Sequence, residues 1–246
     1  MRSLLLLAAA LCAGLVPAQT AVALPGDTGK VQVPDGWTVL GAEALARSSR
    51  PTDPTDEPAH SMLLAIVEVL QEHHRTADNV VLHQPGRSPG QLRTINVYSA
   101  PGAVTAAELQ SDRAVEQMRK ALAEGLAVAG TEVTFTGSAK WERFAVGGIT
   151  LGFELAADDV HYIDRVHAVP AGDRIQYFET HYDKSDAGAD AAIASVLATF
   201  DGAREQPRGY SSGVIIGAIA GALGGVLAGL ARRHRKVAAA ATPRDG

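Results

Sequence analysis

The sequence predicts an α+β protein: an antiparallel β-sheet with helices packed on its faces, exported from the cytoplasm and followed by one C-terminal transmembrane helix. Three observations predict this. An apolar segment opens the 246-residue chain. Apolar and polar residues alternate through its second half, which is typical of half-buried strands. Residues 213–231 form a nineteen-residue run without a charge, about the length that a bilayer-spanning helix needs.

The first 23 residues have the three parts of a secretory signal peptide. Arg2 supplies a positive charge, residues 4–16 are apolar, and Ala21-Val22-Ala23 is a small-x-small cleavage motif. We therefore expect cleavage after Ala23; an uncleaved N-terminal anchor is the alternative. The chain's one cysteine, Cys12, lies in this segment, so the mature protein is expected to form no disulfide.

Residues 24–200 are expected to form the exported domain. Two short strands, 31–34 and 37–40, are joined by an Asp35-Gly36 turn. Prolines and acids in 50–61 indicate an exposed loop. The apolar run 62–70 suits a strand buried on both faces. Residues 72–91, which include His73-His74, are expected to be irregular, and a strand resumes at 92–98.

A long helix is predicted after these strands. Thr105 and Glu108 form a capping box, in which both side chains satisfy backbone donors at the helix start. Gly130 suits the position just past the helix end. One apolar stripe should lie on the sheet; its members are Leu109, Val115, Met118, Leu122 and Leu126.

The second half of the domain alternates with period two. Strands are expected at 132–136, 141–146 and 149–155, and a hairpin should pair 160–169 with 174–182 across a four-residue turn. A final helix is expected at 187–200, because Ile193, Val196, Leu197 and Phe200 recur at helical spacing. Residues 201–212 are polar and should form a linker.

The predicted transmembrane helix, 213–231, has small residues along one face. Five glycines recur every four residues, a spacing that keeps them on one side of a helix and allows close backbone approach between helices. We therefore expect the helix to self-associate through them; the alternative is that their abundance is only compositional. The glycines of this expected interface are Gly213, Gly217, Gly221, Gly225 and Gly229.

Charge is distributed unevenly along the chain. Residues 24–208 hold 16 basic and 26 acidic residues, a net charge of −10, whereas the tail 232–246 holds five basic and one acidic, a net charge of +4. The acidic domain argues against nucleic acid as a partner. The basic tail, next to the apolar run, predicts a cytoplasmic C-terminus. We expect a bacterial cell membrane protein with one span and its N-terminal domain outside the cytoplasm.

The opening Val33-Pro34-Asp35-Gly36-Trp37, the mid-chain helix, the run of hairpins and a closing strand-helix pair resemble the PsbP-like domains, including the bacterial DcrB-type relatives. The resemblance covers about residues 30–203. It implies an antiparallel sheet with helices on its faces, and a family of mostly accessory or assembly proteins without a catalytic site. The transmembrane helix departs from the usual form of that family.

Histidines are the candidate metal ligands, and their spacing does not gather them. His161 and His167 share one strand, about 20 Å apart at ~3.3 Å per residue. The expected turn places His181 opposite Tyr162, on the other face of the sheet. Adjacent residues His73 and His74 diverge, and Asp158-Asp159 lacks the spacing of a calcium loop. We therefore expect no metal site.

No catalytic motif appears in the sequence. A serine-nucleophile elbow, a phosphate loop and a dinucleotide fingerprint are all missing. The sequence therefore favours a membrane-anchored envelope protein, not an enzyme and without a cofactor, whose domain is a binding or assembly module for another envelope protein. The alternative is a ligand sensor or hydrolase that uses the loops 50–61 and 72–91 as a pocket rim. A third interpretation makes the glycine helix the working part and the domain its spacer.

Overall fold

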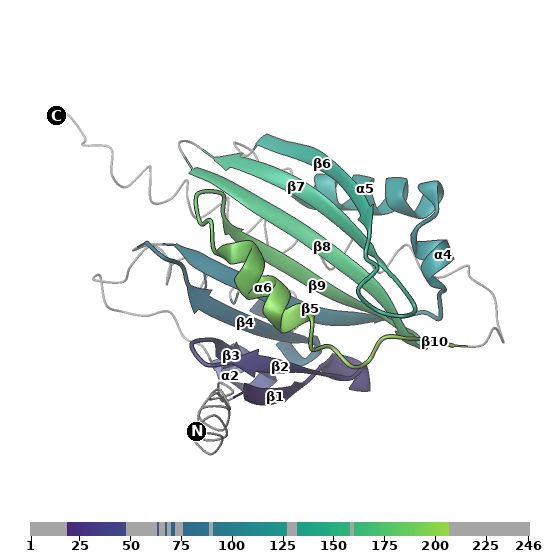
Figure 1. The fold of residues 1–246 in the computed structure, drawn as a ribbon, viewed down its shortest axis with the longest axis horizontal. Coiled ribbons are helices and arrows are strands. Elements are labelled where there is room, and N and C mark those ends of the chain that lie inside the picture. The colour runs from purple at the N-terminus through teal and green to yellow at the C-terminus, as the bar shows by residue number, and fades with distance from the viewer. Residues whose placement is uncertain are drawn as a thin grey trace, which may run out of the picture.

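The computed structural model describes residues 19–47, 63, 67, 70–71, 76–88, 91–126, 132–157 and 160–206. This part of the chain is mostly antiparallel sheet with a few helices, an α+β arrangement (Figure 1). Within it, no helix is long and apolar enough to cross a membrane. The predicted transmembrane helix, its glycine row, the basic tail and the loop 50–61 lie outside the described residues.

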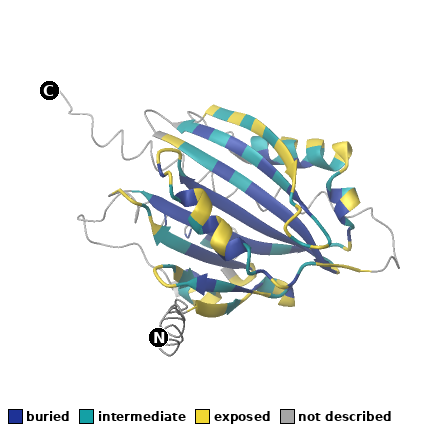
Figure 2. Cartoon of the chain, in the orientation of Figure 1, coloured by how far each residue is buried: buried dark blue, intermediate teal, exposed yellow. Residues whose placement is uncertain are grey.

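The central sheet has the strand order β3-β4-β5-β9-β8-β7-β6, with antiparallel neighbours throughout. A two-residue strand, β10, adds to β8 in parallel at Ala171 and Gly172. Long neighbouring strands β5, β9 and β8 form the middle of the sheet, so their residues are the most enclosed (Figure 2). The strands span β3 (Thr38–Leu40), β4 (Asn79–Pro85), β5 (Leu92–Pro101), β6 (Glu132–Lys140), β7 (Ile149–Ala157), β8 (Val160–Gly172), β9 (Arg174–Asp183) and β10 (Arg204–Glu205).

One face of the sheet is covered by helices from the middle of the chain. Met118 and Leu122 of α5 (Asp112–Leu126) and Leu109 of α4 (Ala106–Leu109) pack on apolar side chains of β7 and β8. Leu45 of α2 (Ala42–Arg47) joins the same core, as does helical Leu63. We call this the first face.

The opposite, second face carries the N-terminal hairpin and the last helix. Strands β1 (Gln19–Ala23) and β2 (Lys30–Pro34) pair antiparallel with each other, joined through the 3₁₀ turn η1 (Pro25–Asp27). Helix α6 (Ala189–Leu197) lies over β5 and β9 on this face (Figure 1). Its Ile193 and Val196 share a core with Val31 and Val33 of β2 and with Phe178 of β9.

Two predictions between residues 62 and 91 were wrong. The apolar run expected to be a strand is helical at each of its described positions, and Leu63, Val67 and Leu70 are buried together. Their spacing of four and three residues is that of one helix face. Residues 79–85, expected to be irregular, form β4, and Asn79 to Leu82 are buried. Val81 belongs to the core of the first face, and Val80 and Leu82 to the core of the second.

Two further elements differ from the expectation. Residues 141–146 are a series of turns between β6 and β7 and not a strand. The long mid-chain helix is divided into α4 and α5 at Gln110 and Ser111. Its capping box is confirmed: Glu108 N–H donates to Thr105 Oγ1 at 3.2 Å, and Thr105 N–H donates to Glu108 Oε2 at 2.8 Å.

Candidate functional site

Polar side chains gather in the middle of the sheet, on the first face. The register places Thr94 of β5, His181 of β9 and Asp164 of β8 in one row across three neighbouring strands. Asn96 and Glu179 form the next row on the same face. Because alternate residues of a strand share a face, these five side chains lie together among apolar core residues. We call them the buried polar cluster.

The cluster is almost closed to solvent. The exposed fractions are 0% for Asp164, 3% for Glu179 and 5% for His181. A charge or polar group at this depth is costly unless it is paired. The contacts within the cluster therefore decide what it can do.

Three polar contacts link the cluster across the strands, one of them from the Thr94 hydroxyl to His181 O at 3.4 Å. His181 Nδ1 lies 3.4 Å from Asp164 Oδ2, an ion-pair distance when the imidazole is protonated. Asn96 Nδ2 donates to Glu179 Oε2 at 3.1 Å. The His181 ring also stacks on the Tyr162 ring, with centroids 4.7 Å apart. Within the described residues, both Asp164 carboxylate oxygens, both His181 ring nitrogens, Glu179 Oε1 and Asn96 Oδ1 have no hydrogen-bond partner.

Burial shifts the protonation of both acids in the same direction. It raises the pKa of Asp164, and the neighbouring His181 partly opposes this. The pKa of Glu179 is raised well above its ordinary value, first by burial and then by the charge of Asp164. Glu179 therefore binds its proton more tightly than a solvated glutamate does. The arrangement places a carboxyl of raised pKa and one acid-imidazole pair in the buried interior, so it couples protonation to folding.

The three histidines predicted on the last hairpin are distributed as expected. His181 points to the first face, whereas His161 and His167 alternate onto the second. The expected pairing partner of His181 was wrong: it is Asp164 and not Tyr162. The turn contains only Gly172 and Asp173, with Ala171 opposite Arg174, so the register is displaced by two residues and the faces are unchanged.

Each histidine on the second face has its own surroundings. His167 Nδ1 lies 2.8 Å from Thr150 Oγ1, and its ring lies 4.8 Å from that of Trp141. Burial, reinforced by the charge of Arg165, lowers the pKa of His167 to about 3, so it is neutral at physiological pH. His161 is half-exposed, with Nδ1 3.5 Å from a Glu154 carboxylate oxygen. In the described part of the chain, no three His, Cys, Asp or Glu side chains are grouped to hold a metal ion.

A second buried polar contact fixes the segment before α6. Arg93 donates from Nε and Nη2 to the two carboxylate oxygens of Asp186, at 2.7 and 2.9 Å, and from Nη1 to Gln84 Oε1 at 2.8 Å. The Arg93 hydrogen bonds hold the pKa of Asp186 below its usual value. A bidentate pair of this kind positions a turn firmly, so it sets where α6 begins.

The buried polar cluster was missed by reasoning from the sequence. Its signal is a polar residue at a position that the alternation of a strand assigns to the core. In β8, Asp164 stands between Tyr162 and Val166, and in β9 Glu179 and His181 follow Tyr177 with the same period. His73, His74, Asp158 and Asp159 lie outside the described residues.

Comparisons with known proteins show similarity of structure but not of sequence. No protein-family model and no curated protein matches the sequence. The fold is similar to the solution structure of the cyanobacterial PsbP protein CyanoP from Synechocystis sp. PCC 6803, with a TM-score of 0.43 and 11% identity over 77% of this chain and 96% of that one. This is a weak PsbP-like fold resemblance, and it carries no argument about function.

Proposed function

We propose that this chain is a single-pass protein of a bacterial cell membrane whose exported α+β domain is a non-catalytic binding or assembly module for another envelope protein. An N-terminal signal directs the domain out of the cytoplasm, residues 213–231 anchor it, and the tail 232–246 stays in the cytoplasm. The proposal assigns no cofactor and no metal ion to the domain. A second copy of the chain is a further partner, through the glycine face of the anchor.

The anchor and its orientation rest on the sequence. Nineteen uncharged residues are followed at once by Arg232-Arg233-His234-Arg235-Lys236, and short basic flanks remain on the cytoplasmic side. The acidic domain, with a net charge of −10 over residues 24–208, is poorly suited to the anionic membrane surface or to nucleic acid. A protein partner fits this charge better.

The observation that carries the non-catalytic assignment is the burial of the acid-base groups. General acid-base catalysis needs a side chain within hydrogen-bond reach of the substrate. Asp164, Glu179 and His181 form the buried acid-imidazole arrangement of the described residues, and all three lie inside the sheet. The other acid-imidazole contact, between His161 and Glu154, lies at the surface, where Lys184 also donates to the Glu154 carboxylate. His167 is also buried and is bonded to Thr150. These groups favour a stabilising role within a binding domain.

Two experiments test the proposal. A reporter protein that is active only in the cytoplasm should be active when it is fused after Gly246. Alkaline phosphatase, which is active only outside the cytoplasm, should be inactive at that position, and its activity there would contradict the orientation.

The second experiment tests for a partner. The full chain with a tag after Gly246 is cross-linked in intact cells and purified in detergent. The control is an unrelated exported domain fused to residues 207–246 and treated in the same way. One defined envelope protein should copurify with the full chain only. Equal recovery with both would assign binding to the anchor and contradict a role of the domain.

A ligand sensor or hydrolase remains the second candidate, and the perturbed carboxyl of Glu179 is the observation that favours it. The sequence assigned the loops 50–61 and 72–91 to the rim of its pocket, but residues 79–85 of the second loop form strand β4. The variant Glu179→Gln separates the two functions. A binding module keeps its partner when Glu179 is replaced, whereas a site that uses this carboxyl loses ligand-induced thermal stabilisation or hydrolytic activity in a screen of small polar metabolites and esters.

A further inference from the structure

Strand β1 is part of the folded domain. All five of its residues pair with β2, from Gln19 opposite Pro34 to Ala23 opposite Lys30. Val22 packs against the core of the second face. The segment expected to contain the signal cleavage motif, Ala21-Val22-Ala23, is therefore the second half of this strand.

The other edge of β2 is hydrogen-bonded to residues that follow α6. Lys30 N–H donates to Asp201 Oδ1 at 2.8 Å, and Asp201 N–H donates to Lys30 O at 3.2 Å. Gln32 N–H donates to Thr199 Oγ1 at 2.7 Å. With β1 on one side and the segment after α6 on the other, the backbone of β2 is bonded along both edges. Removal of β1 would remove its backbone pairing with β2 and the contact of Val22 with the core.

The junction after β1 is also buried. Leu24 is 4% exposed, and its N–H donates to Gly29 O at 2.9 Å. The turn that follows is held to the sheet by Thr28, whose hydroxyl donates to Gln176, and by Ser99, whose hydroxyl donates to Pro25 O at 3.0 Å. A mature chain that began at Leu24 would replace the N–H that donates to Gly29 O by a terminal ammonium.

A second small-x-small sequence precedes β1. Val16-Pro17-Ala18 follows the apolar segment directly, with an alanine next to the bond and valine two residues before it, a looser match to the A-x-A pattern than Ala21-Val22-Ala23. Cleavage after Ala18 would leave β1 whole. Gln19, which lies opposite Pro34 in the register, would then be the N-terminus.

We propose that a signal peptidase hydrolyses the Ala18–Gln19 bond, so that the mature protein begins at Gln19 and retains β1. One water is consumed; Ala18 gains the carboxylate and Gln19 the free amine. This inference rests on the export part of the proposed function. It differs from the expectation from sequence, which placed the bond after Ala23.

The test is the N-terminus of the full chain purified from bacterial membranes through a tag after Gly246, read by mass spectrometry after chemical labelling of free amines. Gln19 is expected as the first residue, free or cyclised with loss of ammonia. Ala18→Phe, which places a large residue next to the bond, should abolish this terminus. The matched control Ala23→Phe, at an exposed position of β1, should be processed as the wild type is.

The other outcomes overturn the inference and are distinguishable from a failure of export. A mature chain beginning at Leu24, lost in Ala23→Phe and unaffected by Ala18→Phe, would place the bond after Ala23 and leave the proposed function intact. A chain retaining Met1 whose domain is degraded by protease added to spheroplasts would mean export without cleavage. A chain retaining Met1 whose domain is protected would contradict export and the proposed function together.

Discussion

Replacing Glu179 by glutamine should stabilise the α+β domain at neutral pH. The Glu179 carboxyl is buried beside Asp164, and both conditions raise its pKa well above the ordinary value of 4.5. At a pH between the unfolded and the folded pKa, the folded protein holds a proton that the unfolded chain has released. The contribution of this group to stability is therefore complete below about pH 4.5 and is lost as the pH rises through the folded pKa.

The magnitude follows from the linkage of one proton to folding. In the window between the two pKa values, the wild type should lose about 1.4 kcal/mol of unfolding free energy per pH unit through this group. Glutamine keeps the shape and can still accept the hydrogen bond that Asn96 donates, at 3.1 Å in the wild type, but it does not titrate. The stability difference between Glu179→Gln and wild type should therefore grow by about that amount per unit as the pH rises above 4.5.

The assay is urea unfolding of the full chain in detergent, followed by tryptophan fluorescence over a series of pH values. Trp141, which packs beside His167 and Phe178, reports the core of the second face. Asp164 titrates in both proteins and is coupled to Glu179 in the wild type, so the difference between the two curves reports the titration of the pair relative to Asp164 alone. Glu132→Gln, at an exposed position of β6, is the matched control and should follow the wild type.

One result would refute this reasoning. If Glu179→Gln is less stable than the wild type by the same amount at every pH, the carboxyl does not take up a proton on folding. The buried polar cluster would then be held by an ionised Glu179 with a partner outside the described residues.

Three further predictions concern other parts of the chain. Asp186→Asn should destabilise the domain by about 3–5 kcal/mol in urea unfolding, because it leaves a buried arginine without its anionic partner; since the Asp186 pKa is lowered, the wild-type contribution should be lost as the pH falls through that pKa. Gly29→Ala should cost roughly 1–3 kcal/mol, because φ is +139° and a Cβ would lie 2.7 Å from the Gly202 backbone, whereas Gly41→Ala, with open space around it, should be near neutral by thermal unfolding. Gly221→Ile should abolish self-association in a membrane two-hybrid assay and Ile219→Val should not; equal signals would mean that the glycine row is compositional.

Patterns with strict periodicity predicted the fold well. The alternating segments gave β7, β8 and β9, and the capping box gave the beginning of α4. Alternation also placed His181 and His167 on opposite faces of the sheet, because a register error of two residues leaves every side chain on its own face. Such an error changes the residue that lies opposite on the neighbouring strand, and for His181 that residue is Asp164. The acid-imidazole pair therefore depends on a turn length that residues 170–173 did not specify.

Short apolar runs were the source of the errors. A run such as 62–70 is compatible with a buried strand or a buried helix, because periodicity is hidden when every position is apolar. The segment 79–85 ends in His83, Gln84 and Pro85 and so lacks the alternation of a half-buried strand, yet β3 and β5 pair with it on both sides. In 141–146, Trp141 and Phe144 mimic a strand pattern but fold back to pack on Phe178 and Phe200. Each of these outcomes is decided by tertiary contacts.

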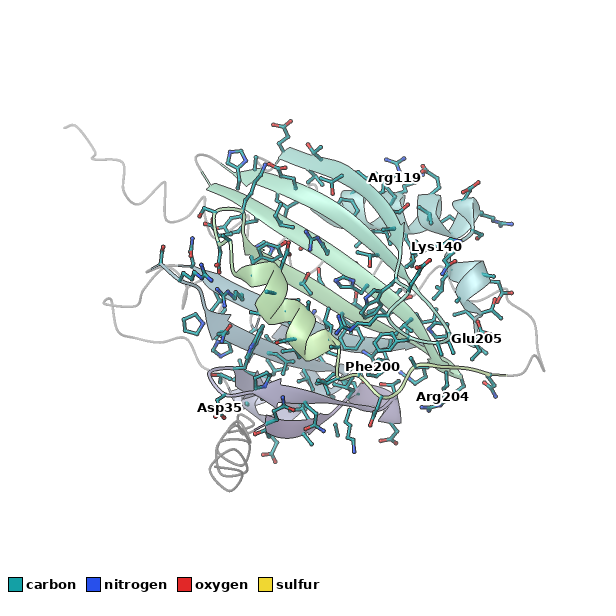
Figure 3. All side chains as sticks on the ribbon, in the orientation of Figure 1. Asp35, Arg119, Lys140, Phe200, Arg204 and Glu205 are labelled. Carbon is teal, nitrogen blue, oxygen red and sulfur yellow. The ribbon has the colours of Figure 1, made fainter. Side chains whose placement is uncertain are left out.

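Strand β10 limits how far the sheet can lie from the proposed membrane anchor. Strand β10 joins β8 beside the β8–β9 turn, and Glu205 accepts a hydrogen bond from Ala106 N–H at 2.7 Å, at the start of α4 (Figure 3). Gly213, where the proposed anchor begins, is eight residues beyond Glu205, so even a fully extended connection spans only about 28 Å. On the proposed topology, the β8–β9 turn therefore lies within that distance of the membrane surface. The opposite end of the sheet, where Arg93 holds Asp186 ahead of α6, is then the end that the proposed partner meets first.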